Sequence, residues 1–279
     1  LSQSELATQK ALEFAKIRKQ GHAKIDNGKG VILDHPDVRR MLLTMKSLTA
    51  AARALCLDAA LSLDLSKSND KQLANKENAR ASFLIPIAKA FSTDIGCRVA
   101  DIGIQVHGGM GYVEETGVAQ ILRDVRVTAI YEGTNGIQAI DLVGRKLSDS
   151  GKAANDLIDE MKTTTSECYN NADQHIKEMG KRLSKSLECL ETSLNWMLKQ
   201  EDFNEKLAGA TPFLKAFGLM LGANYLVKAA LKTGSLDRKS LAQFYCINML
   251  PEMEAYGVMS QSGKNSLYKF SDRFFGFSQ

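Results

Sequence analysis

Apolar residues recur in steps of three and four along most of the chain, the spacing of helices that bury one face. One such stripe occupies residues 6–17, and a longer one follows Pro36 and continues to about residue 63. Pro36 suits a first helical turn, because the N–H that it lacks would have no partner there, and Asp34 or His35 stands at the N-cap. The spacing therefore predicts one long helix after Pro36.

A third apolar stripe, over residues 83–102, follows the polar connector 66–78 and predicts a second long helix. Pro86 should either kink this helix or lie in its first turn. Glycines then break the period over residues 107–117 and again over 131–136, which predicts two loops. A helix should follow the second loop and end near residue 147.

The helical pattern pauses at SDSG, residues 148–151, and a second helical unit follows. This unit contains leucines and a methionine in alternating steps of four and three, the spacing of nearly parallel packed helices, at Leu183, Leu187, Leu190, Leu194 and Met197. No useful stretch alternates with period two. The chain should therefore be all-α, with two helical units over residues 1–147 and 148–279.

Charge and composition exclude some partners. The 36 basic and 32 acidic side chains are interleaved, without blocks of five or six like charges, so we expect no nucleic-acid partner. No uninterrupted apolar stretch approaches the roughly 18 residues that indicate a membrane span, and the first segment is too polar for a signal peptide. We therefore expect no membrane association.

Cysteines and histidines bear on the compartment and on metals. The five cysteines are scattered and form no C-x-x-C pair, which favours free thiols in a reducing, cytoplasmic compartment. The four histidines are mutually distant and show no zinc-ligand spacing, so we expect no metal site. The chain enters a helical pattern at once, without a start signal, and reads as a piece of a longer protein.

Both glycine-bearing loops contain candidate functional residues. The run QVHGGMGY, Gln105 to Tyr112, can bring backbone N–H groups close to a pyrophosphate, although an ordinary helix connector has the same composition. The run IYEGTNGIQ places Glu132 between aromatic and aliphatic neighbours. A desolvated carboxylate there would be a stronger base toward a carbon acid. The alternative is a glutamate that only favours the dipole of the next helix.

In order and spacing the two loops together resemble the acyl-CoA dehydrogenase family. The carboxyl-terminal pattern of that family is matched by Q-x-x-G-G-x-G-Y, then Arg123 and Asp124, then I-Y-E-G-T-x-x-I-Q. Upstream, FAKIRKQG and HPDVRRML are also similar to family segments, so the resemblance covers about residues 1–147. Residues 151–279 resemble, in length, position and helical character, a module appended to some bacterial members, including the 3-methylmercaptopropionyl-CoA type.

The resemblance implies a specific reaction. Glu132 would remove the α-proton of an acyl-CoA while the β-hydrogen leaves as hydride to FAD, which gives a trans-2-enoyl-CoA. The backbone N–H of Glu132 would polarise the thioester carbonyl, as in an oxyanion hole. Tyr131 and Gly133, on either side of the base, would contact the substrate.

The resemblance also implies a cofactor site and partners. FAD would be contacted by five residues, two of them, Gln105 and Gly109, across a homodimer interface: Arg18, Gln20, Gln105, Gly109 and Thr134. Two positions depart from the family pattern, because the aromatic residue often found before Gly21 is absent and Gly136 replaces a frequent glutamine. The electron acceptor would be the electron-transferring flavoprotein.

Two other classes of function compete with the enzyme. One is an inactive relative that binds DNA, and the other is a helical interaction module with vestigial cofactor loops. The retained Glu132 and the mixed surface charge favour the enzyme over the DNA binder.

Overall fold

The computed structural model describes residues 1–23 and 25–276. Within these ranges the chain forms helices joined by turns, and none of these residues lies in a β-strand. The all-α prediction is confirmed.

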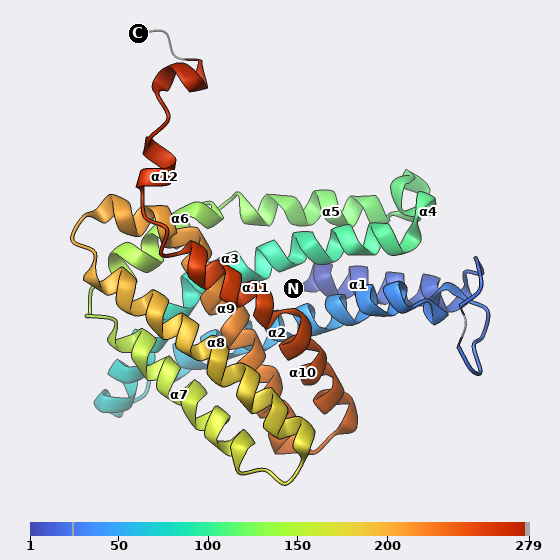
Figure 1. The fold of residues 1–279 in the computed structure, drawn as a ribbon, viewed down its shortest axis with the longest axis horizontal. Coiled ribbons are helices and arrows are strands. Elements are labelled where there is room, and N and C mark those ends of the chain that lie inside the picture. Colours follow the sequence, from blue (N-terminus) through green and yellow to red (C-terminus); the bar gives the residue numbers. More distant parts are fainter. Residues whose placement is uncertain (24, 277–279) are drawn as a thin grey trace.

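Four helices of the first unit run side by side (Figure 1). They are α1 (Ser2–Ile17), α2 (Pro36–Leu65), α3 (Lys71–His107) and α5 (Val118–Arg126). The helix predicted after Pro36 is confirmed, with His35 as its N-cap and Pro36 in its first turn. The first glycine-bearing segment follows the C-terminal end of α3, and the second contacts the middle of that helix at Lys89 and Thr93.

Helix α3 differs from its prediction at the start. Asp70 is its N-cap and accepts hydrogen bonds from the backbone N–H groups of Gln72 and Leu73 at 2.9 and 3.3 Å. The second half of the supposed connector is therefore helical. Pro86 lies well inside the helix and not in its first turn.

Short helical turns occupy much of the first predicted loop, whereas the second is non-helical over residues 131–134, as predicted. The first loop contains α4 (Gly109–Tyr112) and the 3-10 turn η2 (Glu114–Thr116). After α5, the turn η3 (Val127–Ala129) leads through the second glycine-bearing segment to α6 (Asn135–Asp141). Helix α6 continues into a π-helical turn, η4 (Leu142–Lys146).

The second unit crosses the first obliquely (Figure 1). Its helices are α7 (Lys152–Tyr169), α8 (Gln174–Lys199), α9 (Phe203–Thr233), α10 (Leu236–Asn248) and α11 (Leu250–Met259). The predicted leucine stripe of α8 is buried. The chain passes between the units in a turn in which Ser150 and Gly151 have φ angles of 60° and 73°.

One continuous apolar core connects the two units. At their junction the Phe83 ring of α3 meets the Phe217 ring of α9 edge to face, with centroids 5.0 Å apart. Helix α9 also contacts α2 and α6. The division near residue 148 remains a prediction as a domain boundary, because the core itself does not stop there.

Helix α9 is the central apolar helix. It is long enough and apolar enough, at a mean hydropathy of 1.2, to cross a membrane, but 72% of the most apolar window is buried inside the protein. Its apolar composition is explained by that burial among other helices.

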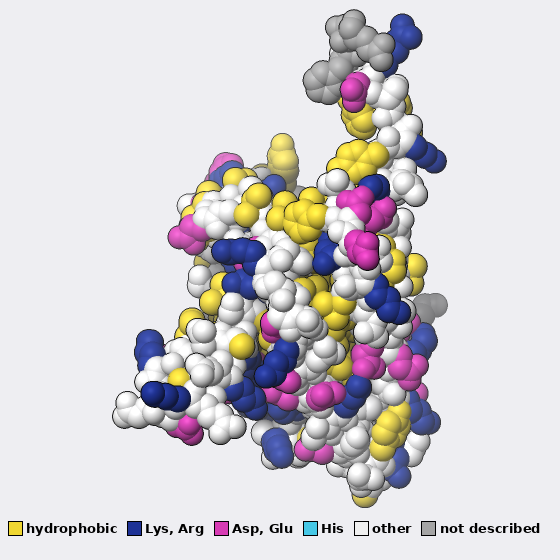
Figure 2. Space-filling view, turned by 90° about the vertical axis from the view of Figure 1, so that its left-hand side faces the viewer, with side chains coloured by type: hydrophobic (Ala, Val, Ile, Leu, Met, Phe, Trp, Pro, Cys, Tyr) yellow, Lys and Arg dark blue, Asp and Glu magenta, His cyan; other side chains and the backbone are white. Residues whose placement is uncertain are grey.

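A C-terminal segment projects from the helical body (Figures 1 and 2). It contains α12 (Asn265–Tyr268) and η5 (Asp272–Phe275). Its apolar side chains are exposed, namely Leu267, Tyr268, Phe270, Phe274 and Phe275. Its base is held by the backbone N–H of Lys264, which donates to Oε2 of Glu205 at 2.8 Å.

Candidate active site

The turn between η3 and α6 contains the predicted catalytic base. Glu132 has a left-handed backbone with a φ of 52°, and Gly133 follows with a φ of 83°. A positive φ is uncommon outside glycine and persists only where the surrounding structure imposes it. Nε2 of Gln138 donates to the Glu132 carbonyl at 3.3 Å. We refer to residues 131–135 as the Glu132 turn.

The Glu132 side chain itself is exposed. The expectation that its carboxylate is desolvated is therefore wrong for this chain. The physical reason lies in its neighbours, because Ile130 and Tyr131, which should cover it, are each 50% exposed. The described residues therefore do not enclose the Glu132 carboxylate in an apolar pocket.

Side chains of α3 hold the Glu132 turn from one side. Nζ of Lys89 donates to the Gly133 carbonyl at 2.8 Å and to Oδ1 of Asn135 at 2.9 Å. Nδ2 of Asn135 in turn donates to Oδ1 of Asp94 at 2.7 Å and to Oγ1 of Thr93 at 3.0 Å. We call Lys89, Thr93 and Asp94 the α3 clasp.

The α3 clasp was not predicted from the sequence, although one signal was present. Lys89 is the only charged residue between Arg80 and Asp94, in an otherwise largely apolar run on a helix. A lysine in such a position needs oxygen partners when it is partly buried. Burial lowers the pKa of Lys89, while the nearby charges of Asp94 and Glu132 act in the opposite direction.

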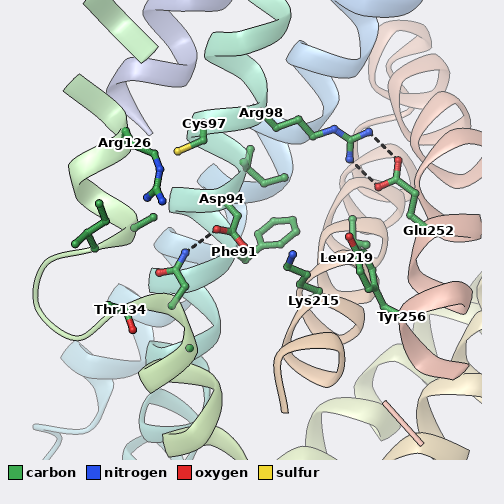
Figure 3. A pocket seen from close by; sticks show the side chains of 15 residues that line it. Phe91, Asp94, Cys97, Arg98, Arg126, Thr134, Lys215, Leu219, Glu252 and Tyr256 are labelled. Carbon is green, nitrogen blue, oxygen red and sulfur yellow. Dashed lines mark hydrogen bonds and ion pairs between the residues drawn. The ribbon is translucent and has the colours of Figure 1, made fainter. Parts of the chain in front are cut away.

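A cavity of about 560 Å³ lies beside the turn, between α3, α6, α9 and α11 (Figure 3). Thr134, one of the predicted FAD contacts, lines it and is the N-cap of α6, with Oγ1 accepting from the Ile137 N–H at 3.4 Å. On the opposite wall Arg98 and Glu252 form two hydrogen bonds of 2.7 Å. Both helical units thus contribute to this cavity.

A second groove, of about 710 Å³, lies at the C-terminal end of α3. It brings together the four remaining residues that the resemblance assigned to FAD: Arg18, Gln20, Gln105 and Gly109. We call it the glycine groove. These residues come from segments far apart in sequence, so the fold places the predicted set in one location.

The glycine groove has the features that a phosphate group needs. Gly108 has a φ of 59°, and a Cβ atom added at Gly108 or Gly109 would meet no atom within 4 Å, so the backbone is open to a ligand. The Arg18 side chain is exposed at the same groove. Open backbone and a guanidinium together suit a pyrophosphate.

His107, at the end of α3, packs as part of the groove wall. Its ring stacks on Phe14 with centroids 4.5 Å apart, and Nδ1 forms a hydrogen bond with the Gly103 carbonyl at 2.7 Å. Burial lowers the pKa of His107, so the neutral ring is favoured. This histidine shapes the groove without supplying a cation.

The Glu132 turn and the glycine groove are well separated. Lys89, which touches the turn, and Gln105, which lines the groove, lie 16 residues apart on α3 (105 minus 89). At 1.5 Å per residue their axial separation is about 24 Å. Thr134 therefore lies with the base, away from the other four predicted FAD contacts.

No group of three or more His, Cys, Asp or Glu side chains that could hold a metal ion occurs in residues 1–23 and 25–276.

Comparison with known proteins identifies the family. A family model described as "Acyl-CoA dehydrogenase, C-terminal domain" matches residues 3–147. The chain belongs to the acyl-CoA dehydrogenase family. The Glu132 turn and the glycine groove both lie within this match. A second model of the acyl-CoA dehydrogenase type, "Acetyl-CoA dehydrogenase C-terminal like", matches residues 157–271.

Two curated relatives named as acyl-CoA dehydrogenases are similar to this chain. The chain is 38% identical to 3-methylmercaptopropionyl-CoA dehydrogenase of Ruegeria pomeroyi, a match that covers 81% of this chain and 40% of that protein. It is 40% identical to a butyryl-CoA dehydrogenase of Syntrophomonas wolfei over 50% of this chain and 23% of that protein. The chain thus spans less than half the length of these relatives.

Solved structures share the fold at low sequence identity. Caenorhabditis elegans ACDH-11 in complex with C11-CoA aligns with a TM-score of 0.72 and 21% identity, over 88% of this chain and 40% of that chain. An acyl-CoA dehydrogenase complexed with FAD from Bacillus anthracis aligns at 0.68 and 16% identity, over 98% and 48%. Both matches extend beyond the first unit, which supports the helical architecture of both units.

Proposed function

We propose that this chain is the C-terminal part of a flavin-dependent acyl-CoA dehydrogenase that converts an acyl-CoA into a trans-2-enoyl-CoA. The observation that supports this most directly is Glu132, which occupies the Y-E-G-T position of the family and has a constrained backbone. Acyl-CoA dehydrogenases among the curated relatives support the same reaction class.

In the proposed mechanism the Glu132 carboxylate accepts the α-proton of the acyl-CoA. The backbone N–H of Glu132 makes no hydrogen bond to any described residue, so it is available to the thioester carbonyl. A donor at that oxygen stabilises the negative charge that develops as the proton leaves. The side chain and the backbone of Glu132 would therefore act on the same substrate from one turn, flanked by Tyr131 and Gly133.

The proposed cofactor is FAD, which when bound supplies the acceptor for the β-hydride. Its pyrophosphate and adenosine would be held by Arg18, Gln20, Gln105 and Gly109 in the glycine groove, and Thr134 would contact it beside the base. The open backbone at Gly108 and Gly109 fits this role.

The separation of about 24 Å along α3 supports a two-fold dimer. In such a pair the glycine groove of one copy can serve the FAD that lies against the Glu132 turn of the other. Further proposals are that the electron-transferring flavoprotein takes the electrons and that the enzyme works in the cytoplasm, without nucleic acid or membrane.

The test is Glu132→Gln in the enzyme that contains this chain. The amide keeps the shape but cannot accept the proton, so FAD and acyl-CoA binding should persist. The rate of flavin reduction, measured in anaerobic stopped-flow experiments, should fall by about 100-fold to 10,000-fold, which is the usual contribution of a general base. Reduction at the wild-type rate would exclude Glu132 as the base. An enzyme that binds no FAD would instead support a non-catalytic helical module or DNA-binding relative.

A further inference from the structure

The backbone of the Glu132 turn needs something to hold it. Glu132 and Gly133 have successive positive φ angles, and for a glutamate this conformation is strained. The carbonyls of these two residues accept a long hydrogen bond of 3.3 Å from Gln138 to the Glu132 oxygen and a short one of 2.8 Å from Lys89 to the Gly133 oxygen. The shorter contact comes from another helix, α3.

The Lys89 ammonium group donates hydrogen bonds to the Glu132 turn and forms no salt bridge with a described carboxylate. Two of its donors go to the Gly133 carbonyl and the Asn135 amide oxygen, and no carboxylate among the described residues lies within salt-bridge distance of it. Hydrogen bonds from a charged donor are about twice as strong as neutral ones. The contact is therefore strong enough to hold a strained peptide.

Asn135 fixes the other end of the turn. Besides Thr93 and Asp94, its Nδ2 approaches the Ala90 carbonyl at 3.3 Å. Since Asn135 is the first residue of α6, the start of that helix is tied to α3 by the same cluster that contains Lys89. The Glu132 turn is thus held on both sides of Thr134.

The packing behind Lys89 leaves α3 little freedom to move. A Cβ atom on Gly218 of α9 would lie 2.6 Å from the ring of Phe91, two residues after Lys89. The second helical unit therefore packs in close contact with the part of α3 that holds the turn. Because this part of α3 is closely packed, Lys89 can hold the Glu132 turn in one position.

We propose that Lys89 is a positioning residue, which holds the Glu132 turn against α3 and thereby sets the place of the base. This rests on the proposed function of Glu132. The effect on chemistry is indirect, because Lys89 contacts the turn and not the substrate.

The first experiment tests the clasp without any reaction. NMR spectra of this chain are compared for wild type, Lys89→Met, Lys89→Arg and the control Lys76→Met, an exposed lysine on the same helix. Lys89→Met should shift and broaden the backbone amides of residues 133–135 and leave those of the glycine groove in place. Lys89→Arg should restore much of the wild-type pattern. Unchanged turn amides in Lys89→Met would overturn the proposal.

The second experiment links the turn to the base in the FAD-loaded enzyme that contains this chain. Lys89→Met should lower the rate of flavin reduction on the order of 100-fold, the effect of misplacing a reacting group by about 1 Å, with acyl-CoA binding nearly unchanged. Lys89→Arg should recover most of the rate. A shifted turn with a wild-type rate would show that Lys89 does not position the base. A wild-type enzyme that fails to reduce flavin would count against the proposed function, while the NMR result would still decide the clasp.

Discussion

The charge balance around Lys89 leads to a prediction at the level of a single residue. Burial lowers the pKa of this lysine, and the carboxylate of Asp94 opposes that shift. Asp94→Asn removes the opposing charge, so the pKa of Lys89 should fall further below its ordinary 10.5. Titration of the Lys89 side chain by heteronuclear NMR in both proteins measures the difference.

The same lowered pKa has a consequence for stability. At pH values just below 10.5, the unfolded chain keeps the lysine proton while the folded chain releases it. The unfolded state then binds more protons, so the contribution of Lys89 to stability rises with pH in this window. The difference in unfolding free energy between wild type and Lys89→Met, measured as a function of pH, gives this contribution.

The account of the Lys89 pKa would be contradicted if that pKa rose in Asp94→Asn.

At the residue scale, the sequence predicted which residues belong to the candidate site better than it predicted how exposed they are. Arg18, Gln20, Gln105 and Gly109 were grouped by their resemblance to family motifs, and the structure places them around one groove. The exposure of Glu132 could not be predicted, because burial depends on segments distant in sequence. The α3 clasp was missed for the same reason, since Lys89 lies 44 residues before Gly133.

At the scale of elements, local signals predicted the middles of helices better than their ends. Apolar spacing located α2 and the body of α3 because one face of each is buried in the core. The first turns of α3 are polar and bury no apolar face, so apolar spacing does not mark them, although Asp70 was available as an N-cap signal. Tight approach of α4 to α3 leaves no trace in hydrophobic spacing.

That approach predicts a contrast between two neighbouring glycines. A Cβ atom on Gly111 would lie 2.4 Å from the Ile104 carbonyl oxygen and 3.0 Å from Cβ of His107, while one on Gly109 would meet nothing within 4 Å. Gly111→Ala should therefore push α4 away from α3 and lower the unfolding free energy by about 1–3 kcal/mol, as overpacking does. Gly109→Ala is the matched control and should change stability little. Urea denaturation measures both, and equal midpoints would refute the tight packing of α4.

At the scale of the whole molecule, the pause at residues 148–151 indicated where one helical unit gives way to the next. It gave no sign that the core continues across this point, since the contacts of α9 with α2 and α3 join residues far apart in the chain. Such contacts depend on the shapes of the packed helices and not on local spacing.

A polar cluster also crosses the junction of the two units. Arg80 of α3 donates to Asp58 of α2 at 2.7 Å and to Glu160 of α7 at 2.5 Å. The Tyr225 hydroxyl of α9 donates to the same Asp58 carboxylate. The Arg80 and Asp58 side chains are only 14% and 18% exposed, so water screens this pair weakly. The Arg80 guanidinium links α3 to α2 and α7, and the Asp58 carboxylate adds α9, so four helices from both units meet in this cluster.

Shared core and shared guanidinium together predict that both units unfold in one transition. Trp196, the single tryptophan, reports on α8 of the second unit, and far-ultraviolet circular dichroism reports on the whole chain. Both probes should give the same urea midpoint in wild type. Arg80→Met leaves the Asp58 and Glu160 carboxylates without their cation, and it should lower both midpoints together. The unfolding free energy should fall by up to about 3 kcal/mol, since Glu160 is partly exposed. The control Arg53→Met removes an ion pair with Glu5 whose side chains are 47% and 39% exposed. It should lower the unfolding free energy by at most about 1 kcal/mol.

Separate wild-type midpoints for the two probes would instead mean that the units fold independently, and then Arg80→Met should leave the tryptophan transition in place.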